Sequence, residues 1–195
     1  MISLHVYHSD EEVWKIMSLS AVKIEILQSM LLNDKPVKAI IIAKESGNDF
    51  RPTMMHLLDL TRKGYTSSPE KGQFILTEKG KQILGIPGIT NETAKIILAQ
   101  TPEKAFHFYI GLEQPTNTYA NSLKDFTEII QKLEAQSIEF HVQRGDFEKW
   151  FECIGDEELA KKMAKLKAKS LQGEELRQKL HYIVENRYKK LSAMI

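Results

Sequence analysis

Residues 49–77 read DFRPTMMHLLDLTRKGYTSSPEKGQFILT, and this stretch decides the fold of the N-terminal half. It predicts a helix that begins between Asp49 and Pro52, since proline suits the first helical turn. The helix should end at Lys63, because Gly64 is a typical stop. Its residues at i, i+3, i+4 and i+7 are Met54, Leu57, Leu58 and Thr61. This spacing marks one face of a helix, and we expect that face to lie in the core.

A β-hairpin should follow this helix. Residues 65–68 are typical of a strand, residues 69–72 (PEKG) of a turn, and residues 73–76 (QFIL) of the returning strand. Thr77 is then expected to cap a short helix that ends at Gly85.

Two further helices are expected before this stretch. Ser20 can cap a helix over residues 21–32, and Pro36 should open a helix over 37–46 that stops at Gly47. Closer to the N-terminus, the alternation in residues 2–6 predicts a short strand. Residues 9–12 (SDEE) form a capping box for a short helix through Met17.

The composition is that of a globular protein without a strong electrostatic bias. The 195 residues are 42% hydrophobic and 27% charged, with a net charge of +1. Binding to nucleic acid would therefore need a local basic patch. The single cysteine, Cys153, excludes an intrachain disulfide, and beside Phe151 and Ile154 we expect it to be buried.

Neither a secretory signal nor a membrane-spanning segment is evident. The N-terminal residues lack a basic region followed by an apolar one. The longest apolar run, residues 39–43, is far shorter than the ~20 residues of a spanning helix. We expect a cytoplasmic protein without a membrane partner.

Three helices, a hairpin and a closing helix are the order of a winged helix-turn-helix. Over about residues 19–85 the chain resembles MarR/PadR-like winged-helix transcription regulators, particularly small archaeal ones. The pieces that carry the resemblance are LS at 19–20, KPV at 35–37, RPT at 51–53, RKGY at 62–65 and LTEKG at 76–80. The resemblance implies sequence-specific binding to double-stranded DNA, with the third helix in the major groove. We expect a homodimer, because dimerisation would fit two half-sites about one helical turn apart.

The resemblance also implies which residues would contact DNA. Those that match base-reading positions of the third helix are Arg51, Thr53, Met55 and His56. We add Arg62 and Lys63 at the end of that helix, and Lys71 and Gln73 at the tip of the hairpin, as contacts to phosphates or the minor groove. Residues 61–82 carry a local net charge of +3, which favours this prediction.

An alternative stays open for the same segment. Winged helices also serve as protein-docking modules, and the third helix is not strongly basic. Asp49 and Asp59 would repel phosphates if they lay on its free face. The alternative function is therefore an adaptor without affinity for DNA.

The sequence GIPGI at 85–89 is typical of a linker, so we expect domains over residues 1–88 and 89–195. The second domain should be α+β and largely helical. We expect a helix over 92–100, a strand over 106–110, a polar loop over 111–118, a helix over 119–135 and a strand over 137–142. Helices should follow from Asp146, from Gly155–Asp156 to about Ser170, and over 174–192.

About residues 104–190 resemble an archaeal and bacterial domain family without a known role. The resemblance rests on FHFYIG at 106–111, TNTYANSLKDF at 116–126, SIEFHVQRGDFEKWF at 137–151, GDEELAKKM at 155–163 and GEELRQKL at 173–180. It implies a sensing, dimerisation or docking module, with a protein or a small molecule as partner.

The two expected strands would present polar side chains on one shared face. The residues of this possible ligand face are His107, Tyr109, Glu139, His141 and Arg144. We favour a ligand pocket over catalysis or metal binding, because no nucleophile elbow, phosphate loop or HExxH helix is present. We therefore expect neither an enzyme nor a cofactor.

Five lysines and no acidic residue occupy residues 159–173. They are Lys161, Lys162, Lys165, Lys167 and Lys169. A phosphate-binding surface is one interpretation. We favour a solvated helix face near a helix C-terminus, where the helix dipole favours cations.

Overall fold

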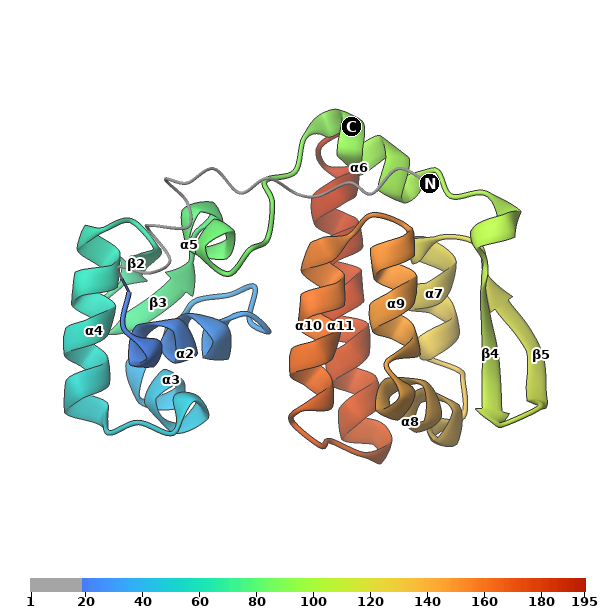
Figure 1. Ribbon diagram of the computed structural model, residues 1–195, viewed down its shortest axis with the longest axis horizontal. Helices are drawn as coiled ribbons and strands as arrows, with labels where there is room; N and C mark the ends of the chain where they lie inside the picture. Colours follow the sequence, from blue (N-terminus) through green and yellow to red (C-terminus); the bar gives the residue numbers. More distant parts are fainter. Residues whose placement is uncertain (1–18) are drawn as a thin grey trace. The chain divides into compact units, whose positions relative to one another are not determined.

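A computed structural model describes residues 19–195. The strand expected at 2–6 and the helix expected at 9–17 lie outside the described residues. Contacts divide the chain into two units, Met1–Ile86 and Pro87–Ile195, which we call the N-terminal and C-terminal units (Figure 1). This division falls two residues before the domain boundary that the sequence predicts.

The N-terminal unit has the expected order of three helices, a hairpin and a closing helix. Its elements are α2 (Ala21–Met30), β1 (Val37–Lys38), α3 (Ala39–Ser46), α4 (Phe50–Arg62), β2 (Thr66–Glu70), β3 (Gln73–Leu76) and α5 (Glu78–Ile83). The helix expected to open at Pro36 starts only at Ala39. Val37 and Lys38 instead pair with Phe74 and Gln73, so β3 is the middle strand of a three-stranded sheet.

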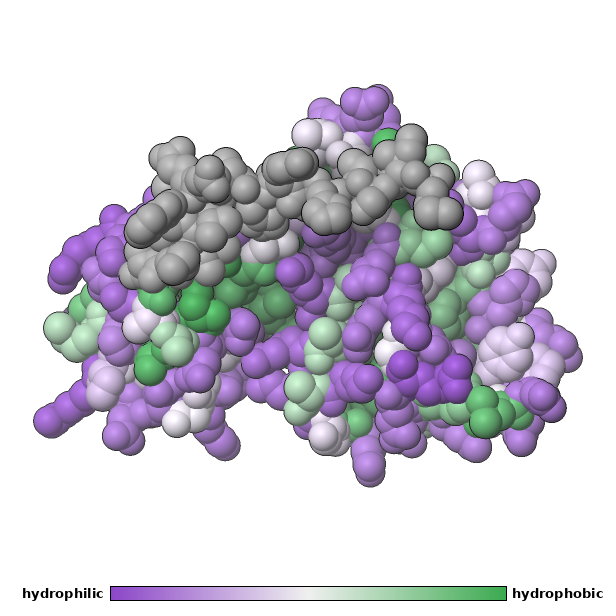
Figure 2. All heavy atoms as spheres, in the orientation of Figure 1, coloured by the Kyte–Doolittle hydropathy of each residue, from purple (hydrophilic) through white to green (hydrophobic). Residues whose placement is uncertain are grey.

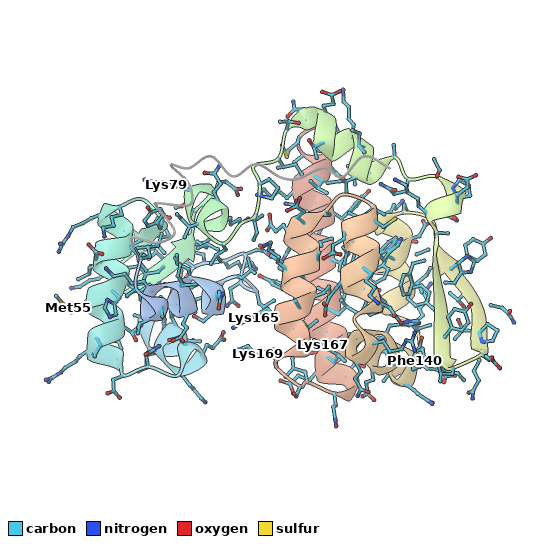
Figure 3. The ribbon with its side chains drawn as sticks, viewed as in Figure 1. Met55, Lys79, Phe140, Lys165, Lys167 and Lys169 are labelled. Atoms are coloured by element: carbon cyan, nitrogen blue, oxygen red, sulfur yellow. The ribbon has the colours of Figure 1, made fainter. Side chains whose placement is uncertain are left out.

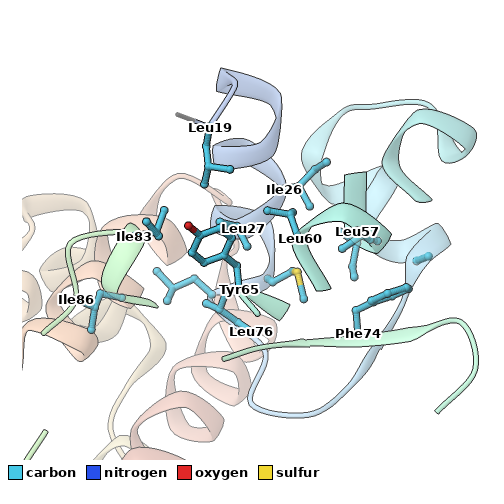
Figure 4. Packing of buried hydrophobic residues seen from close by; sticks show 14 residues of the cluster. Leu19, Ile26, Leu27, Leu57, Leu60, Tyr65, Phe74, Leu76, Ile83 and Ile86 are labelled. Atoms are coloured by element: carbon cyan, nitrogen blue, oxygen red, sulfur yellow. The ribbon is translucent and has the colours of Figure 1, made fainter. Parts of the chain in front are cut away.

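The core of this unit lies between α2, α4 and the sheet, and Figure 4 shows its packing. The side chains that α4 contributes are Thr53, Leu57 and Leu60, all fully buried. The predicted core face is therefore right for Leu57 and in part for Met54, which packs against the core while partly buried, and it is wrong for Leu58, which is 37% exposed. Thr53, Leu57 and Leu60 also follow a helical spacing, and packing against α2, α3 and β2 selects their face.

The hairpin is bonded to the end of α4. The Thr77 hydroxyl donates to the carbonyl oxygen of Gly64 at 2.7 Å, and it accepts the Gly80 backbone N–H at 3.1 Å as the predicted cap of α5. These bonds hold the hairpin in a defined position relative to α4.

The C-terminal unit combines a two-stranded hairpin with a group of helices (Figure 1). Its elements are α6 (Asn91–Leu98), a 3-10 turn (Pro102–Lys104), β4 (Phe106–Gly111), β5 (Gln114–Ala120), α7 (Leu123–Ile130), α8 (Ala135–Arg144), α9 (Asp146–Cys153), α10 (Glu157–Lys167) and α11 (Gly173–Ser192). The long α11 contacts α6, α7, α8 and α10. The chain is thus α+β and mostly helical, as the sequence predicts.

Three expectations for this unit are wrong. The segment 111–118 is not a loop, because its residues from Gln114 onward form β5, which pairs with β4 and extends to Ala120. The expected helix over 119–135 is accordingly shortened to α7. The segment 137–142 is not a strand but part of α8, whose buried residues are Ser137, Ile138, His141 and Val142. Their spacing of i, i+1, i+4 and i+5 is helical.

Aromatic rings fill the space between β4, α7 and α9. The Phe126 ring stacks on Trp150 at 5.1 Å between centroids and meets Phe147 edge-on at 5.1 Å, while Phe106 meets Phe108 at 4.9 Å. The Trp150 indole donates to the carbonyl oxygen of Lys104 at 2.7 Å, so its polar atom is satisfied. This cluster fixes β4 against the helices.

Buried charges join α10 to α11. The Arg187 guanidinium donates to Asp156 at 2.8 Å and to Glu158 at 2.6 Å, and Lys162 lies 3.1 Å from Glu158. All four side chains are nearly inaccessible to solvent. The expectation that the lysines of this segment share a solvated face is therefore wrong for Lys162.

The prediction that Cys153 is buried is also wrong, because its side chain is exposed to solvent. It lies at the last turn of α9, where Trp150 and Phe151 take the inward positions. Within residues 19–195, no helix is long and apolar enough to cross a membrane.

Candidate functional site

The free face of α4 presents a basic and a long apolar side chain one turn apart. Arg51 lies exposed in the first turn, and Met55 is 64% exposed and extends away from the unit (Figure 3). His56, next along the helix, is half-buried, whereas Arg62 and Lys63 are exposed at its C-terminal end. The structure therefore places these predicted residues along one accessible helix.

Thr53 does not belong to that face. Its side chain is completely buried, and its hydroxyl has no hydrogen-bond partner within residues 19–195. The prediction that Thr53 contacts DNA is wrong, because the core-facing side of α4 begins at this residue rather than at Met54.

Two lysines offset the negative charge of Asp59. Its carboxylate lies 2.6 Å from the Lys23 ammonium on α2 and 3.2 Å from that of Lys63. The hydrogen bond from Lys23, followed by that from Lys63, lowers the pKa of Asp59. The repulsion that Asp59 would exert on a phosphate is thus offset within the unit.

The hairpin carries an exposed lysine at its turn. Lys71 is exposed beside Gly72, where the chain reverses between β2 and β3. Gln73 is half-buried and donates its amide to the Glu70 carboxylate. Of the two residues predicted at the tip, Lys71 is therefore the more accessible.

Lys79 on α5 is a cation that was not among the residues predicted to contact DNA. Its ammonium lies 4.9 Å from the centre of the Tyr65 ring and donates to the carbonyl oxygen of Lys63 at 2.7 Å (Figure 3). It therefore adds positive charge close to the C-terminal end of α4. Its position after a threonine cap, and so in the first turn of a helix, is the signal that sequence reasoning could have used.

Apolar side chains are also exposed on α3 and α4. Those on α3 are Ile40 and Ile41, and those on α4 are Phe50, Met55 and Leu58. Figure 2 shows hydrophobic and hydrophilic residues interspersed over the visible face of this unit. The surface is therefore mixed rather than purely basic.

The C-terminal unit contains a cavity of about 290 Å³ between β4, the turn that follows β4, α8 and the start of α9. It is lined by Phe106, His107, Tyr109, Gly111, Leu112, Glu113, Phe140, His141, Arg144 and Asp146. Four of the five residues of the predicted ligand face meet here. They do so because α8 packs against β4, and not because two strands share a face.

Glu139 is the exception in the predicted ligand face. Its carboxylate accepts the backbone N–H of Gly173 at 2.7 Å, at the start of α11, and it lines a different cavity. Glu139 therefore stabilises a helix terminus, and its assignment to the ligand face is wrong.

His141 connects β4 to α8 and α9. Its Nε2 accepts the Tyr109 backbone N–H at 2.8 Å, and its Nδ1 lies 2.8 Å from an Asp146 carboxylate oxygen. Accepting at Nε2 assigns the proton of the neutral ring to Nδ1. Burial lowers the pKa of His141, although the hydrogen bond to Asp146 opposes this effect. Both ring nitrogens are engaged, so neither can bind a metal ion or take a proton from a substrate in this arrangement.

A second bond from α8 supports the same strand. The Ser137 hydroxyl donates to the carbonyl oxygen of Tyr109 at 2.7 Å. Ser137 and His141, one helical turn apart, thus satisfy both backbone polar groups of Tyr109 on the edge that β5 does not cover. A helical interpretation of residues 135–144 would have found this pair.

Arg144 is the one strong cation at the cavity. Its Nε donates to Asp146 at 3.1 Å, and its guanidinium lies 5.1 Å from the centre of the Phe140 ring. These two contacts fix a side chain that is still 48% exposed. Among residues 19–195, no group of three or more His, Cys, Asp or Glu side chains has an arrangement that could hold a metal ion.

Comparison with known families matches residues 86–185, about half of the chain, to a family of unknown function, DUF5752. No curated protein and no solved structure matches the chain.

Proposed function

The chain belongs to the family of unknown function DUF5752, and from its own residues we propose that it is a sequence-specific regulator that binds double-stranded DNA. In this proposal the N-terminal unit is a winged helix-turn-helix, α4 enters the major groove and the β2–β3 hairpin is the wing. The C-terminal unit then serves sensing, dimerisation or docking.

The accessible face of α4 is the observation that carries the proposal. A major groove about 12 Å wide admits one helix, whose N-terminal residues meet base edges. Arg51 and Met55 are exposed at that end of α4. An arginine can donate two hydrogen bonds to guanine, and a methionine can contact a thymine methyl group.

Cations at the other end of α4 and on the hairpin suit phosphate contacts. Arg62, Lys63 and Lys71 are exposed there, and Lys79 adds a further charge. The two lysines that flank Asp59 reduce its repulsion of a DNA backbone. A homodimer would place two such units on half-sites about one helical turn apart, and we expect it to act in the cytoplasm.

The test is a fluorescence-anisotropy titration of full-length protein on its own upstream region and on a scrambled duplex, at several salt concentrations. We expect preference for the native duplex and a logarithmic salt dependence whose slope changes by about 0.9 for each phosphate contacted. Replacing Arg51 and His56 together by alanine should remove the preference and leave non-specific binding. Replacing Lys71 by glutamine should weaken binding to both duplexes alike.

Lys149→Gln is the matched control for charge, because Lys149 is exposed on α9 in the other unit. It should bind both duplexes as the wild type does. An unchanged sequence preference in the Arg51/His56 double variant would contradict the placement of α4 in the groove.

The exposed apolar residues of α3 and α4 favour a second candidate function, a protein-docking adaptor. Ile40 is 56% exposed and Phe50 is 45% exposed, and exposed apolar side chains on neighbouring helices suit contact with a protein partner. An adaptor would show no DNA binding even at low salt and would co-purify with a partner at a stoichiometric level. Ile40→Ser should abolish that co-purification, whereas Lys149→Gln should retain it.

A further inference from the structure

We propose that the cavity lined by β4 and α8 binds a small zwitterion, namely an α-amino acid with an apolar side chain. The proposal goes beyond DNA binding and does not depend on it, because the cavity lies wholly within the C-terminal unit. With a volume of about 290 Å³, it is close to the lower end of the range for ligand pockets, so it suits a small metabolite rather than a dinucleotide.

Arg144 supplies the site for a carboxylate. Its Nε is taken by Asp146 and its flat face by Phe140, which together hold the guanidinium in one orientation. The bonds that the structure gives to Arg144 leave its two terminal amino groups for an acceptor. A guanidinium held in this way matches the two oxygens of a carboxylate.

Glu113 supplies the opposite charge at the same cavity. It lies in the turn between β4 and β5, and it makes no hydrogen bond or ion pair within residues 19–195. Its φ of 58° is uncommon for a residue other than glycine, and its side chain is exposed at the turn.

The two charges together select the class of ligand. A simple anion would be attracted by Arg144 and repelled by Glu113, and a simple cation would meet the reverse. Asp146 already pairs with the Nε of Arg144, so a ligand carboxylate would bind through the two terminal amino groups, and Asp146 and Glu113 together favour a ligand that also carries a cation. A molecule with a carboxylate and an ammonium satisfies both groups.

The apolar part of the ligand has its own surface. Leu112 is 72% exposed at the tip of the turn, and Phe140 forms the wall on α8. An exposed leucine beside a half-buried aromatic ring offers area to an apolar side chain, and covering it removes that area from water. This surface favours leucine or phenylalanine over a polar amino acid.

The experiment is an NMR titration of isotope-labelled full-length protein without DNA. The probes are L-phenylalanine and L-leucine, with N-acetyl-L-phenylalanine lacking the ammonium and L-phenylalaninamide lacking the carboxylate. We expect shifts at residues of β4 and α8, and an affinity at least about tenfold lower for each blocked derivative, the factor for one lost charge-assisted hydrogen bond.

Variants complete the test. Arg144→Gln and Glu113→Gln should each lower the affinity for phenylalanine at least about tenfold. The matched controls Lys149→Gln and Glu152→Gln, both exposed on α9, should not. The proposal fails if neither amino acid binds, if either blocked derivative binds as tightly as phenylalanine, or if Arg144→Gln binds it unchanged. Because no DNA is present, these outcomes leave the proposed regulator untouched.

Discussion

Removing the Arg187 guanidinium should strongly destabilise the C-terminal unit. Arg187→Met keeps much of the apolar stem but deletes the group that bonds Asp156 and Glu158. Asp156 is fully buried, and its carboxylate also accepts the Leu159 backbone N–H at 3.1 Å. The variant would thus leave a buried carboxylate without a counter-charge.

The magnitude follows from that geometry. Deleting one partner of a buried ion pair costs about 3–5 kcal/mol, because the remaining charge stays out of water. For a unit of this size, 1 kcal/mol corresponds to about 4 °C or more, so the melting temperature should fall by more than about 10 °C. Adding Asp156→Asn should recover part of this loss, since asparagine can still cap α10 while carrying no charge.

Calorimetry of the full chain measures the loss, and hydrogen exchange followed by mass spectrometry assigns it to peptides of α10 and α11. Lys189→Gln is the control, because Lys189 is 65% exposed in its pair with Glu185 and should change stability by less than about 1 kcal/mol. If Arg187→Met melts within a few degrees of this control, or if the double variant is less stable than the single one, the reasoning about buried charge is wrong.

Three further predictions concern other parts of the chain. Gly80→Ala places a Cβ 2.1 Å from the Tyr65 carbonyl oxygen, so chemical denaturation should show that the free energy of unfolding falls by about 1–3 kcal/mol. In Gly72→Ala the added Cβ meets no atom within 4 Å, so the free energy of unfolding should fall by only about 1 kcal/mol, because the backbone there is left-handed. Burial lowers the pKa of His141, so the unfolded chain gains a proton first as the pH falls, and stability should be full above about pH 6.5 and decline below it. Chemical denaturation at about pH 7.5 and about pH 5.5, roughly one unit either side of that value, should show a smaller decline in stability for His141→Gln than for the wild type. Exposed Cys153 should react with a thiol reagent in the folded protein at a rate close to that in denaturant.

The order of elements in the N-terminal unit was largely predictable because the residues that begin and end its helices act locally. Glycines at 47 and 64 have the positive φ that ends a helix, and the Thr77 cap is formed as expected. The burial of Thr53 was not predictable in this way. A threonine and a methionine fit the edge of a helical stripe about equally well, and only packing against other elements decides between them.

The C-terminal unit was less predictable because its key segment satisfies two periods. In residues 137–142, Ile138, Phe140 and Val142 alternate as in a strand, while Ile138 and Val142 are also one helical turn apart. β5 was missed for the opposite reason, since its polar residues carry no hydrophobic alternation and are held by pairing with β4. The buried charges of α10 and α11 depend on contacts across 29 and 31 residues, which no local pattern reveals.

Because residues 135–144 are helical, one pair of side chains bonds β4 and a different pair lines the cavity. Ser137 and His141, at i and i+4, bond the free edge of β4. Phe140 and Arg144, also at i and i+4, form a neighbouring pair in which the guanidinium lies over the ring. Because Arg144 makes no bond to β4 among the described contacts, changing it should leave the joint between strand and helix intact. Arg144→Gln is therefore a cleaner probe of the cavity than any change at His141, where loss of binding could not be told from loss of that joint.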